Sequence, residues 1–255
     1  MSEKLPLPSE RPQMSDAMHQ SRWHAIWSKR QRDGGSAPTL AELLALDGFD
    51  VLGGVTVAAF RAHCEYLAVE MSLQAGDTIY DVGCGAGAFL YPFHERGHGV
   101  GGLDYAANLV QIAATAMPGA DVQHGEAATL ESEPSFDAVV AHGSFLYFPD
   151  HAYAAAVLQR MVRKARRHVA ILDVPDEARQ AEALAVRQAT LGPEEYARRY
   201  SGLDHLCFER DWFANALSAI DCTIAVKQQS MPGYLHNPYR FNVFVHLNHA
   251  GSPEG

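Results

Sequence analysis

A glycine-rich segment in the first half of the chain combines a carboxylate with bare backbone. In IYDVGCGAGAFL, Asp81 stands at the carboxyl end of a short apolar run, and Gly83, Gly85 and Gly87 follow at alternate positions. Alternate glycines allow a tight turn with positive backbone angles, and the missing side chains let a ligand lie against the main chain. The segment predicts a cofactor loop, although nicotinamide and flavin enzymes share such loops and close helix packing also uses them.

A second acidic residue, Asp104, narrows the choice of cofactor. It ends the run GVGGLD 17 residues after Gly87, close to the spacing of about 20 at which an acid meets the hydroxyls of a ribose. Asp81 separates the candidates further, because a carboxylate at the start of the loop repels a diphosphate and attracts an ammonium group. We therefore expect a cofactor that carries both a ribose and an ammonium group.

The segments around these residues alternate between short apolar runs and helical patterns. The runs are DTIYDVG, GVGGLD, FDAVVA and HVAILDV, and the stretches between them include AGAFLYPFHERG, YAANLVQIAATAM and HAYAAAVLQRMVRKA. This alternation predicts βαβ units that build a parallel sheet with helices on both faces. Near the end, CTIAVKQQ and RFNVFVHL are joined without a helix, which predicts an antiparallel strand pair at one edge of the sheet.

Three helices are expected before the glycine loop. Thr39 and Glu42 have the spacing of a capping box, and the apolar residues of 56–73 approximate helical spacing. Trp23 and Trp27 stand one helical turn apart, so both indoles share a face of a short amphipathic helix. That helix either packs on the core or closes over the cofactor as a lid.

The order of the motifs resembles one known family. DVGCGAGAF, followed by LDY, HGEAATL and FDAVVAHGSFLYFPD, is similar to the motif series of class I S-adenosylmethionine-dependent methyltransferases, from about Ile79 to Asp173. The resemblance implies a Rossmann-like, doubly wound α/β fold with a mostly parallel seven-stranded sheet, an antiparallel edge strand pair and helices on both faces. It also implies S-adenosyl-L-methionine as the cofactor and S-adenosyl-L-homocysteine as the product.

The same resemblance assigns roles at the methionine and ribose end of the cofactor. Asp81 is expected to order the methionine moiety, and Gly83 and Gly85 to pass beneath it. Asp104 is expected to bind the ribose. Gly87 completes the set of cofactor-binding residues on this side.

At the adenine end the resemblance implies three further contacts. Tyr105, which follows the ribose acid, would cover one face of adenine. Glu126 stands where the family commonly has an aspartate that accepts from the adenine amino group, so the sequence departs from the pattern by one methylene. Ala127 would offer its backbone amide to an adenine nitrogen.

Two residues fall in the family region beside the transferred methyl group: His142, at the end of a strand, and Tyr147 after it. Methyl transfer from a sulfonium is a direct displacement without an enzyme nucleophile, so alignment and desolvation can supply most of the acceleration. A general base is needed only if the acceptor must lose a proton early. His142 is the candidate catalytic base, with a histidine bonded to backbone as the equal alternative, and Tyr147 is expected to wall the pocket.

The methyl acceptor should lie beyond the carboxyl ends of the strands, next to the late loops and added segments. A helical insert around residues 177–220 and the loop GYLHNPYRF supply such material. Arg240 could clamp a carboxylate, although a surface arginine near a turn fits the sequence equally well. The candidate substrate-binding residues are Tyr200, His205, Tyr234, His236 and Arg240.

Composition limits the partners. A formal charge of -10, from 30 acidic and 20 basic residues, offers no basic footprint for nucleic acids or anionic lipids. The four cysteines form no CxxC pair, which favours reduced thiols in the cytoplasm and gives no zinc motif. No apolar run reaches membrane-spanning length and we expect no export signal. We therefore expect no nucleic-acid partner, no membrane and no metal, and the chain is compatible with a homodimer.

The sequence thus predicts a single methyltransferase domain over residues 16–250, between flexible ends at 1–15 and 251–255. The expected activity is transfer of a methyl group from S-adenosylmethionine to a small-molecule acceptor. Two other functions stay open. One is an NAD(P)-dependent oxidoreductase, which uses the same strand, loop and ribose acid, and the other is a non-catalytic regulatory module that binds S-adenosylmethionine.

Overall fold

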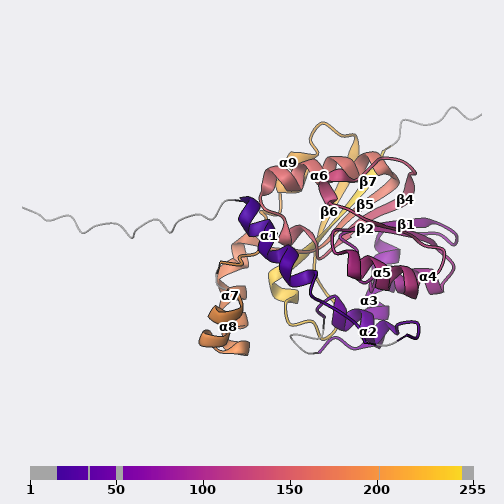
Figure 1. Ribbon diagram of the computed structural model, residues 1–255. Helices are drawn as coiled ribbons and strands as arrows, with labels where there is room; N and C mark the ends of the chain where they lie inside the picture. Colours follow the sequence, from indigo (N-terminus) through magenta and orange to yellow (C-terminus); the bar gives the residue numbers. More distant parts are fainter. Residues whose placement is uncertain (1–15, 34, 50–53, 201, 249–255) are drawn as a thin grey trace, which may run out of the picture.

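A seven-stranded sheet organises the computed structural model, which describes residues 16–33, 35–49, 54–200 and 202–248 (Figure 1). The strand order is β3-β2-β1-β4-β5-β7-β6. The first five strands pair in parallel, and β7 pairs antiparallel with both β5 and β6. The strands are β1 (Thr78–Val82), β2 (Gly99–Asp104), β3 (Asp121–His124), β4 (Phe136–His142), β5 (Ala165–Pro175), β6 (Cys222–Gln228) and β7 (Arg240–Leu247). This confirms the predicted mostly parallel sheet with an antiparallel pair at its edge.

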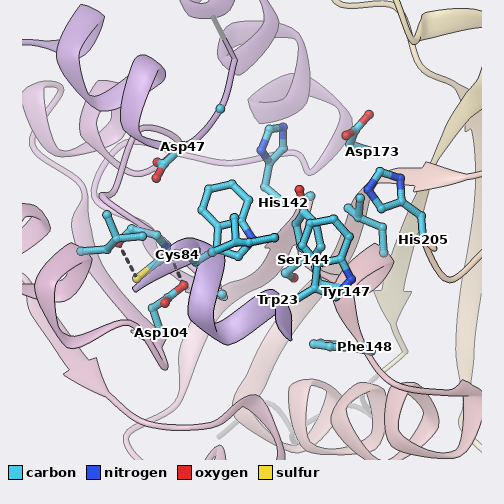
Figure 2. Close-up of a pocket in the computed structure, with 18 of the residues that line it drawn as sticks. Trp23, Asp47, Cys84, Asp104, His142, Ser144, Tyr147, Phe148, Asp173 and His205 are labelled. Carbon is cyan, nitrogen blue, oxygen red and sulfur yellow. Dashed lines mark hydrogen bonds between the residues drawn. The ribbon is translucent and has the colours of Figure 1, made fainter. Parts of the chain in front are cut away.

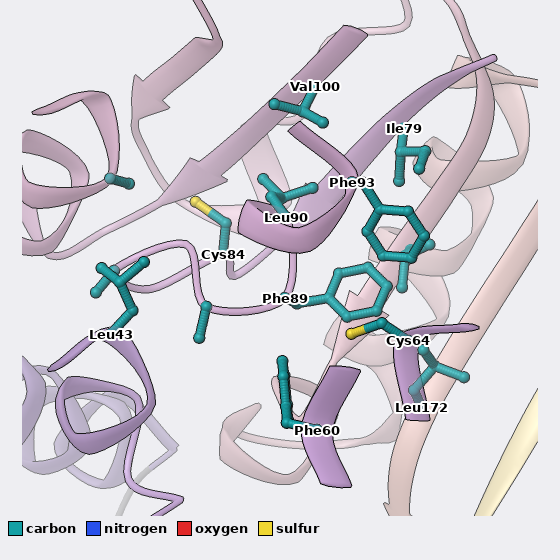
Figure 3. Close-up of a cluster of buried hydrophobic side chains, with 14 of the residues drawn as sticks. Leu43, Phe60, Cys64, Ile79, Cys84, Phe89, Leu90, Phe93, Val100 and Leu172 are labelled. Atoms are coloured by element: carbon teal, nitrogen blue, oxygen red, sulfur yellow. The ribbon is translucent and has the colours of Figure 1, made fainter. Parts of the chain in front are cut away.

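Helices cover both faces of the sheet and enclose two apolar cores. The helices α2 (Leu40–Leu46), α3 (Val57–Glu70), α4 (Tyr91–Glu95) and α5 (Ala107–Ala116) contribute to the first core, part of which Figure 3 shows. The helices α6 (His151–Lys164) and α9 (Trp212–Ala216) contribute to the second. Side chains alternate between the two faces along a strand, so Ile79 of β1 packs in the first core and its neighbour Tyr80 in the second.

The three helices expected before the glycine loop are present. Helix α1 (Asp16–Trp27) contains both tryptophans. Helix α2 begins with the predicted capping box, in which the Thr39 side chain accepts from the backbone of Glu42 and the Glu42 side chain accepts from the backbone of Thr39. Helix α3 begins after Thr56, whose hydroxyl accepts from the backbone of Ala59.

The helix after the glycine loop is shorter than the sequence suggested. The stretch AGAFLYPFHERG predicted a helix from its start, but α4 begins only at Tyr91. In the segment before α4, the backbone N–H groups of Ala86 and Ala88 donate to the side chain of Asp47, about 40 residues earlier in the chain. Strand β3 lacked an apolar run in the sequence because most of its residues are exposed.

The insert before β6 contains α7 (Gln180–Leu191) and α8 (Pro193–Tyr200) in addition to α9. Figure 1 shows α7 and α8 on the same side of the molecule as α1, away from the sheet. The ends expected to be flexible, residues 1–15 and 251–255, lie outside the described residues.

Candidate functional site

A cavity of about 250 Å³ lies at the carboxyl ends of the parallel strands. The strand order reverses between β1 and β4, and open α/β sheets bind their ligands at such a switch point. Asp81 of β1 and His142 of β4 meet there, because the backbone N–H of His142 donates to the Asp81 carboxylate over 3.2 Å. Figure 2 shows Asp47 and Asp104 at one end of the cavity, with Asp173 and His205 at the other.

The glycine loop needs its glycines for two different reasons. Gly83, Gly85 and Gly87 all have positive φ angles, as the sequence predicted. Gly83 and Gly85 line the cavity, whereas Gly87 lies outside its wall, where an added Cβ would come within 2.6 Å of Met117 Cε, just after α5, and within 3.2 Å of Ala113 Cβ of α5. The structure therefore does not bring Gly87 to the expected cofactor site, and its lack of a side chain serves helix packing.

Every backbone N–H from residue 83 to residue 88 already has an acceptor within the protein. Gly83 and Cys84 donate to the Leu103 carbonyl, Gly85 to the Asp104 carboxylate, Ala86 and Ala88 to the Asp47 carboxylate, and Gly87 to the Cys84 carbonyl. A loop that binds a diphosphate does so through free N–H groups beside a helix N-terminus. This loop instead presents carboxylates at the places where phosphates would approach.

Asp47 is a site residue that sequence reasoning missed. It follows α2 and accepts from Ala86 over 2.7 Å and from Ala88 over 3.0 Å, through separate oxygens. Burial raises the pKa of this carboxyl to about 7 despite these hydrogen bonds. The sequence placed Asp47 in a turn, and no spacing rule connects that turn with a loop about 40 residues later.

Asp81 and Asp104 are also buried carboxyls at this end of the cavity. Asp104 accepts from Gly85 over 2.9 Å and from Ala106 over 2.8 Å, which fixes its orientation. Burial raises the pKa of both groups, and nearby acids add to the effect: Asp47 acts on Asp81 and Glu126 acts on Asp104. A bound cation would favour the ionised forms, so the cluster suits a cationic ligand.

The residues expected at the adenine end line the cavity next to α1. Tyr105, Glu126 and Ala127 all contribute to the wall. The His24 ring from α1 stacks on Tyr105 at a centroid distance of 3.8 Å, and its Nε2 lies 3.5 Å from the Glu126 carboxylate. Helix α1 therefore contacts the same side chains that were assigned to adenine.

His142 lies in an aromatic environment between the two ends. Its ring stacks with Phe89 at 5.0 Å and with Phe49 at 5.6 Å. Its Nε2 is buried and has no hydrogen-bond partner among the described residues. Burial lowers the pKa of His142 to about 3, so the imidazole is neutral at physiological pH and too weakly basic for an efficient general base.

Tyr147 forms part of the wall and connects α1 with the insert. Its ring packs edge-on against Trp23 at 4.7 Å and against Trp27 at 5.4 Å. His205 packs against both Tyr147 and Trp23, at 5.6 Å and 5.5 Å. Burial raises the pKa of Tyr147 to about 12, so the phenol stays protonated.

The expected substrate-binding residues gather at the far end of the cavity, where Tyr200, His205, Tyr234, His236 and Arg240 all line the wall. The Tyr234 hydroxyl donates to the Asp173 carboxylate over 2.9 Å, and Arg240 Nη1 donates to the Asp173 carbonyl over 3.3 Å. The alternative of a surface arginine is wrong, because Arg240 is only 4% exposed. Its position at the start of β7, beside the ends of the parallel strands, explains the burial.

Two further residues at this end were not found from the sequence as ligand-facing groups. Asp173 has φ 59°, a conformation that non-glycine residues rarely adopt and that clusters at functional sites. Arg187 of α7 lies within hydrogen-bond distance of His205, with 2.5 Å from Nη1 to Nδ1. The contact between Arg187 and His205 joins two parts of the insert that are 18 residues apart in the sequence.

Within the described ranges, no group of three or more His, Cys, Asp or Glu side chains is placed to hold a metal ion. None of the helices described is both long enough and apolar enough to span a bilayer. The four cysteines are free thiols.

The glycine loop of this chain differs from a loop that binds a diphosphate. Doubly wound folds that bind dinucleotides offer free amides to a diphosphate, whereas here the amides of Gly85, Ala86 and Ala88 donate to the carboxylates of Asp104 and Asp47. The family described as "Methyltransferase domain" matches residues 79–169, a range that includes the glycine loop, Asp104 and His142.

Known methyltransferases are similar to this chain in sequence or in fold. A stretch of 130 residues is 35% identical to nocamycin O-methyltransferase of Saccharothrix syringae and covers 45% of this chain and 46% of that protein, so the chain spans about half the length of the curated relative that it matches. Magnesium protoporphyrin IX methyltransferase of Synechocystis PCC 6803, solved with bound S-adenosylmethionine, is 12% identical with a TM-score of 0.57, over 94% of this chain and 100% of that one. An amino pentose methyltransferase of Micromonospora echinaspora is 16% identical with a TM-score of 0.57, over 85% and 100%. These two structural likenesses support the fold.

Proposed function

We propose that this protein transfers a methyl group from S-adenosylmethionine to a small-molecule acceptor by direct displacement. The observation that carries the proposal is the glycine loop, whose N–H groups are all satisfied while Asp47, Asp81 and Asp104 surround the space beside it. Such a site disfavours the diphosphate of a nicotinamide or flavin cofactor and favours a ligand with an ammonium group and a ribose.

The residues present fit S-adenosylmethionine. Asp81 would hold its ammonium group, Gly83 and Gly85 would leave room for its methionine chain, and Asp104 would accept from its ribose hydroxyls. Each carboxylate oxygen can accept more than one hydrogen bond, so the backbone contacts of Asp104 leave it capable of this role. Tyr105, Glu126 and Ala127 would surround the adenine ring. When bound, the cofactor supplies an electrophilic methyl group on a sulfonium.

His142 and Tyr147 would shape the space beside the methyl group. A neutral His142 adds no positive charge next to the sulfonium, and its stacked neighbour Phe89 keeps water away. The protein then contributes alignment and desolvation, which direct displacement requires. This role replaces the general base that the sequence suggested for His142.

Helix α1 would act as a lid of the single domain. It contacts the adenine side through His24 and the acceptor side through Trp23 and Trp27, so the same helix spans both parts of the cavity. Cofactor exchange would then require α1 to move. Four free thiols are compatible with a cytoplasmic location, where the protein would act as a monomer or a homodimer.

A turnover assay tests the proposed activity. The protein is incubated with methyl-tritiated S-adenosylmethionine and a panel of small aromatic acids, amides, phenols and amines, and label in the organic extract is counted. The expected result is label transfer to at least one acceptor with equal release of S-adenosylhomocysteine. Cofactor binding without transfer to any member of the panel would instead favour the non-catalytic regulatory module.

A further inference from the structure

Two arginines from different elements face the acceptor end of the cavity. Arg240 comes from β7 and is 4% exposed, and Arg187 comes from α7 and is partly buried. Arg187 Nε is shielded from solvent and has no hydrogen-bond partner in the part of the chain that the structure describes. Buried guanidinium nitrogens rarely lack a hydrogen-bond partner, because an unpaired buried donor costs free energy.

The negative charge near these arginines does not balance them. Asp173 is the carboxylate that acts on Arg240, and it already accepts a hydrogen bond from Tyr234. Asp204 also acts on Arg187, but it is exposed, so water and salt screen its field. Among the described residues, the buried carboxylate of Asp173 acts on Arg240 and the exposed carboxylate of Asp204 acts on Arg187, so positive charge is in excess at this end of the cavity.

A third polar group at this end, His236, has a neutral ring. It is 4% exposed and its Nδ1 has no hydrogen-bond partner among the residues described. Burial, together with the positive charges of Arg240 and Arg187, lowers the pKa of His236 to about 3. His236 thus offers a hydrogen-bonding atom and no compensating charge.

We propose that the methyl acceptor is a small-molecule carboxylate that binds through Arg187 and Arg240. The proposal rests on the proposed methyltransferase function and adds the chemical class of its substrate. Arginine forks match the geometry of a carboxylate, and the bound anion supplies the missing charge. The aromatic wall of Trp23, Trp27 and Tyr147 suits an acceptor whose body is aromatic or otherwise apolar.

The test uses matched probes that differ in charge and little in shape. Benzoate with benzamide, and 2-naphthoate with 2-naphthamide, are titrated calorimetrically into full-length protein saturated with S-adenosylhomocysteine. At least one acid should bind about tenfold tighter than its amide. Arg187→Gln and Arg240→Gln should each reduce this preference to about threefold or less, since each removes one charged contact.

Arg198→Gln is the matched control. Arg198 is an exposed arginine of α8 that pairs with Glu195 outside the cavity, so this variant should keep the wild-type preference. If Arg240→Gln fails to fold, the result for Arg187→Gln decides the test, because Arg187 lies on the peripheral helix α7. Equal binding of acids and amides, no binding of either acid, or a preference that survives in Arg187→Gln would overturn the proposal.

The same experiment separates the two proposals. Saturation with S-adenosylhomocysteine is itself followed by calorimetry before the acids and amides are added. If wild-type protein does not bind S-adenosylhomocysteine at that stage, both the methyltransferase function and the acceptor class are refuted. If S-adenosylhomocysteine binds but acids and amides are not distinguished, only the carboxylate inference fails.

Discussion

The two ends of the cavity differ in both charge and origin. The cofactor end combines Asp47, Asp81, Asp104 and Glu126 with a single arginine, Arg30, which acts on Asp47 and donates to carbonyls at the end of α2. The acceptor end reverses this balance, with Arg187 and Arg240 beside Asp173. Opposite fields at the two ends would orient a cationic cofactor and an anionic acceptor toward each other.

Their origins differ as much as their charges. Most of the cofactor end comes from the ends of β1, β2 and β4 and the loops that follow, within the 79–169 range that the family model matches. The acceptor end brings together α1, α7, the end of β5 and the start of β7. A compact motif therefore specifies the first end, while the second exists only after distant segments have folded together.

Of the changes considered, loss of the Asp104 charge should weaken cofactor binding the most. Asp104→Asn keeps one acceptor oxygen for the backbone but removes the charge-assisted contact to the ribose, so affinity for S-adenosylhomocysteine should fall about 10- to 100-fold. Isothermal titration calorimetry measures the change. The exposed Asp121→Asn is the control and should bind as wild type. Unchanged affinity in Asp104→Asn would mean that this acid does not contact the ribose.

Removal of α1 should affect both ends, because this helix contacts each of them. Deletion of residues 1–29 removes His24, Trp23 and Trp27 and should reduce turnover about tenfold or more through loss of water exclusion. Deletion of residues 1–15 retains α1 and serves as the control. Steady-state kinetics on both forms provide the readout, and equal turnover would show that α1 is no lid.

The pKa of Asp47 predicts a pH dependence confined to the cofactor end. Burial raises this pKa to about 7, whereas in the unfolded chain it is about 4. The folded protein therefore holds the extra proton between these values, and the free energy of unfolding of the unliganded protein should fall as pH rises from about 4 to 7.

A cationic ligand beside Asp47 favours its ionised form, so binding of S-adenosylmethionine should release protons near pH 6 and tighten about threefold or more toward pH 8. Calorimetry in two buffers of different ionisation enthalpy counts the protons. Asp47→Asn should release fewer of them. Proton release identical in wild type and Asp47→Asn would assign the titration to another group.

His142 should have the smallest effect on binding. His142→Ala removes a neutral ring whose Nε2 has no hydrogen-bond partner in the described structure, so S-adenosylhomocysteine affinity should stay within about twofold of wild type. If turnover depended strongly on pH in the wild type and this dependence were lost in His142→Ala, His142 would be restored as a base. The expected result is parallel pH profiles for the two proteins.

Local sequence patterns were enough to predict most of the fold and many of the residues at the cofactor end of the cavity. Alternating apolar runs predicted the parallel sheet, and the spacing of Gly83, Gly85 and Asp104 marked residues that the structure brings to the cavity wall. Gly87 was assigned to the cofactor because spacing cannot tell a cavity wall from a helix contact. Strand β3 gave no apolar signal because its side chains are mostly exposed.

The rest of the site depends on contacts between distant segments. Asp47 reaches Ala86 and Ala88 across the chain, and Arg187 reaches His205 from a neighbouring part of the insert. The burial of Arg240 depends on the pairing of β7 with β5. None of these contacts has a local pattern, so only the folded structure identifies the residues.

A glycine loop whose amides are bound by carboxylates should accept an ammonium-bearing nucleoside and reject a diphosphate. Separate calorimetric titrations of S-adenosylhomocysteine and NADH into the same protein sample test it most directly. We expect saturable binding of S-adenosylhomocysteine at micromolar concentrations and no detectable heat from NADH. Tight NADH binding with no response to S-adenosylhomocysteine would contradict it.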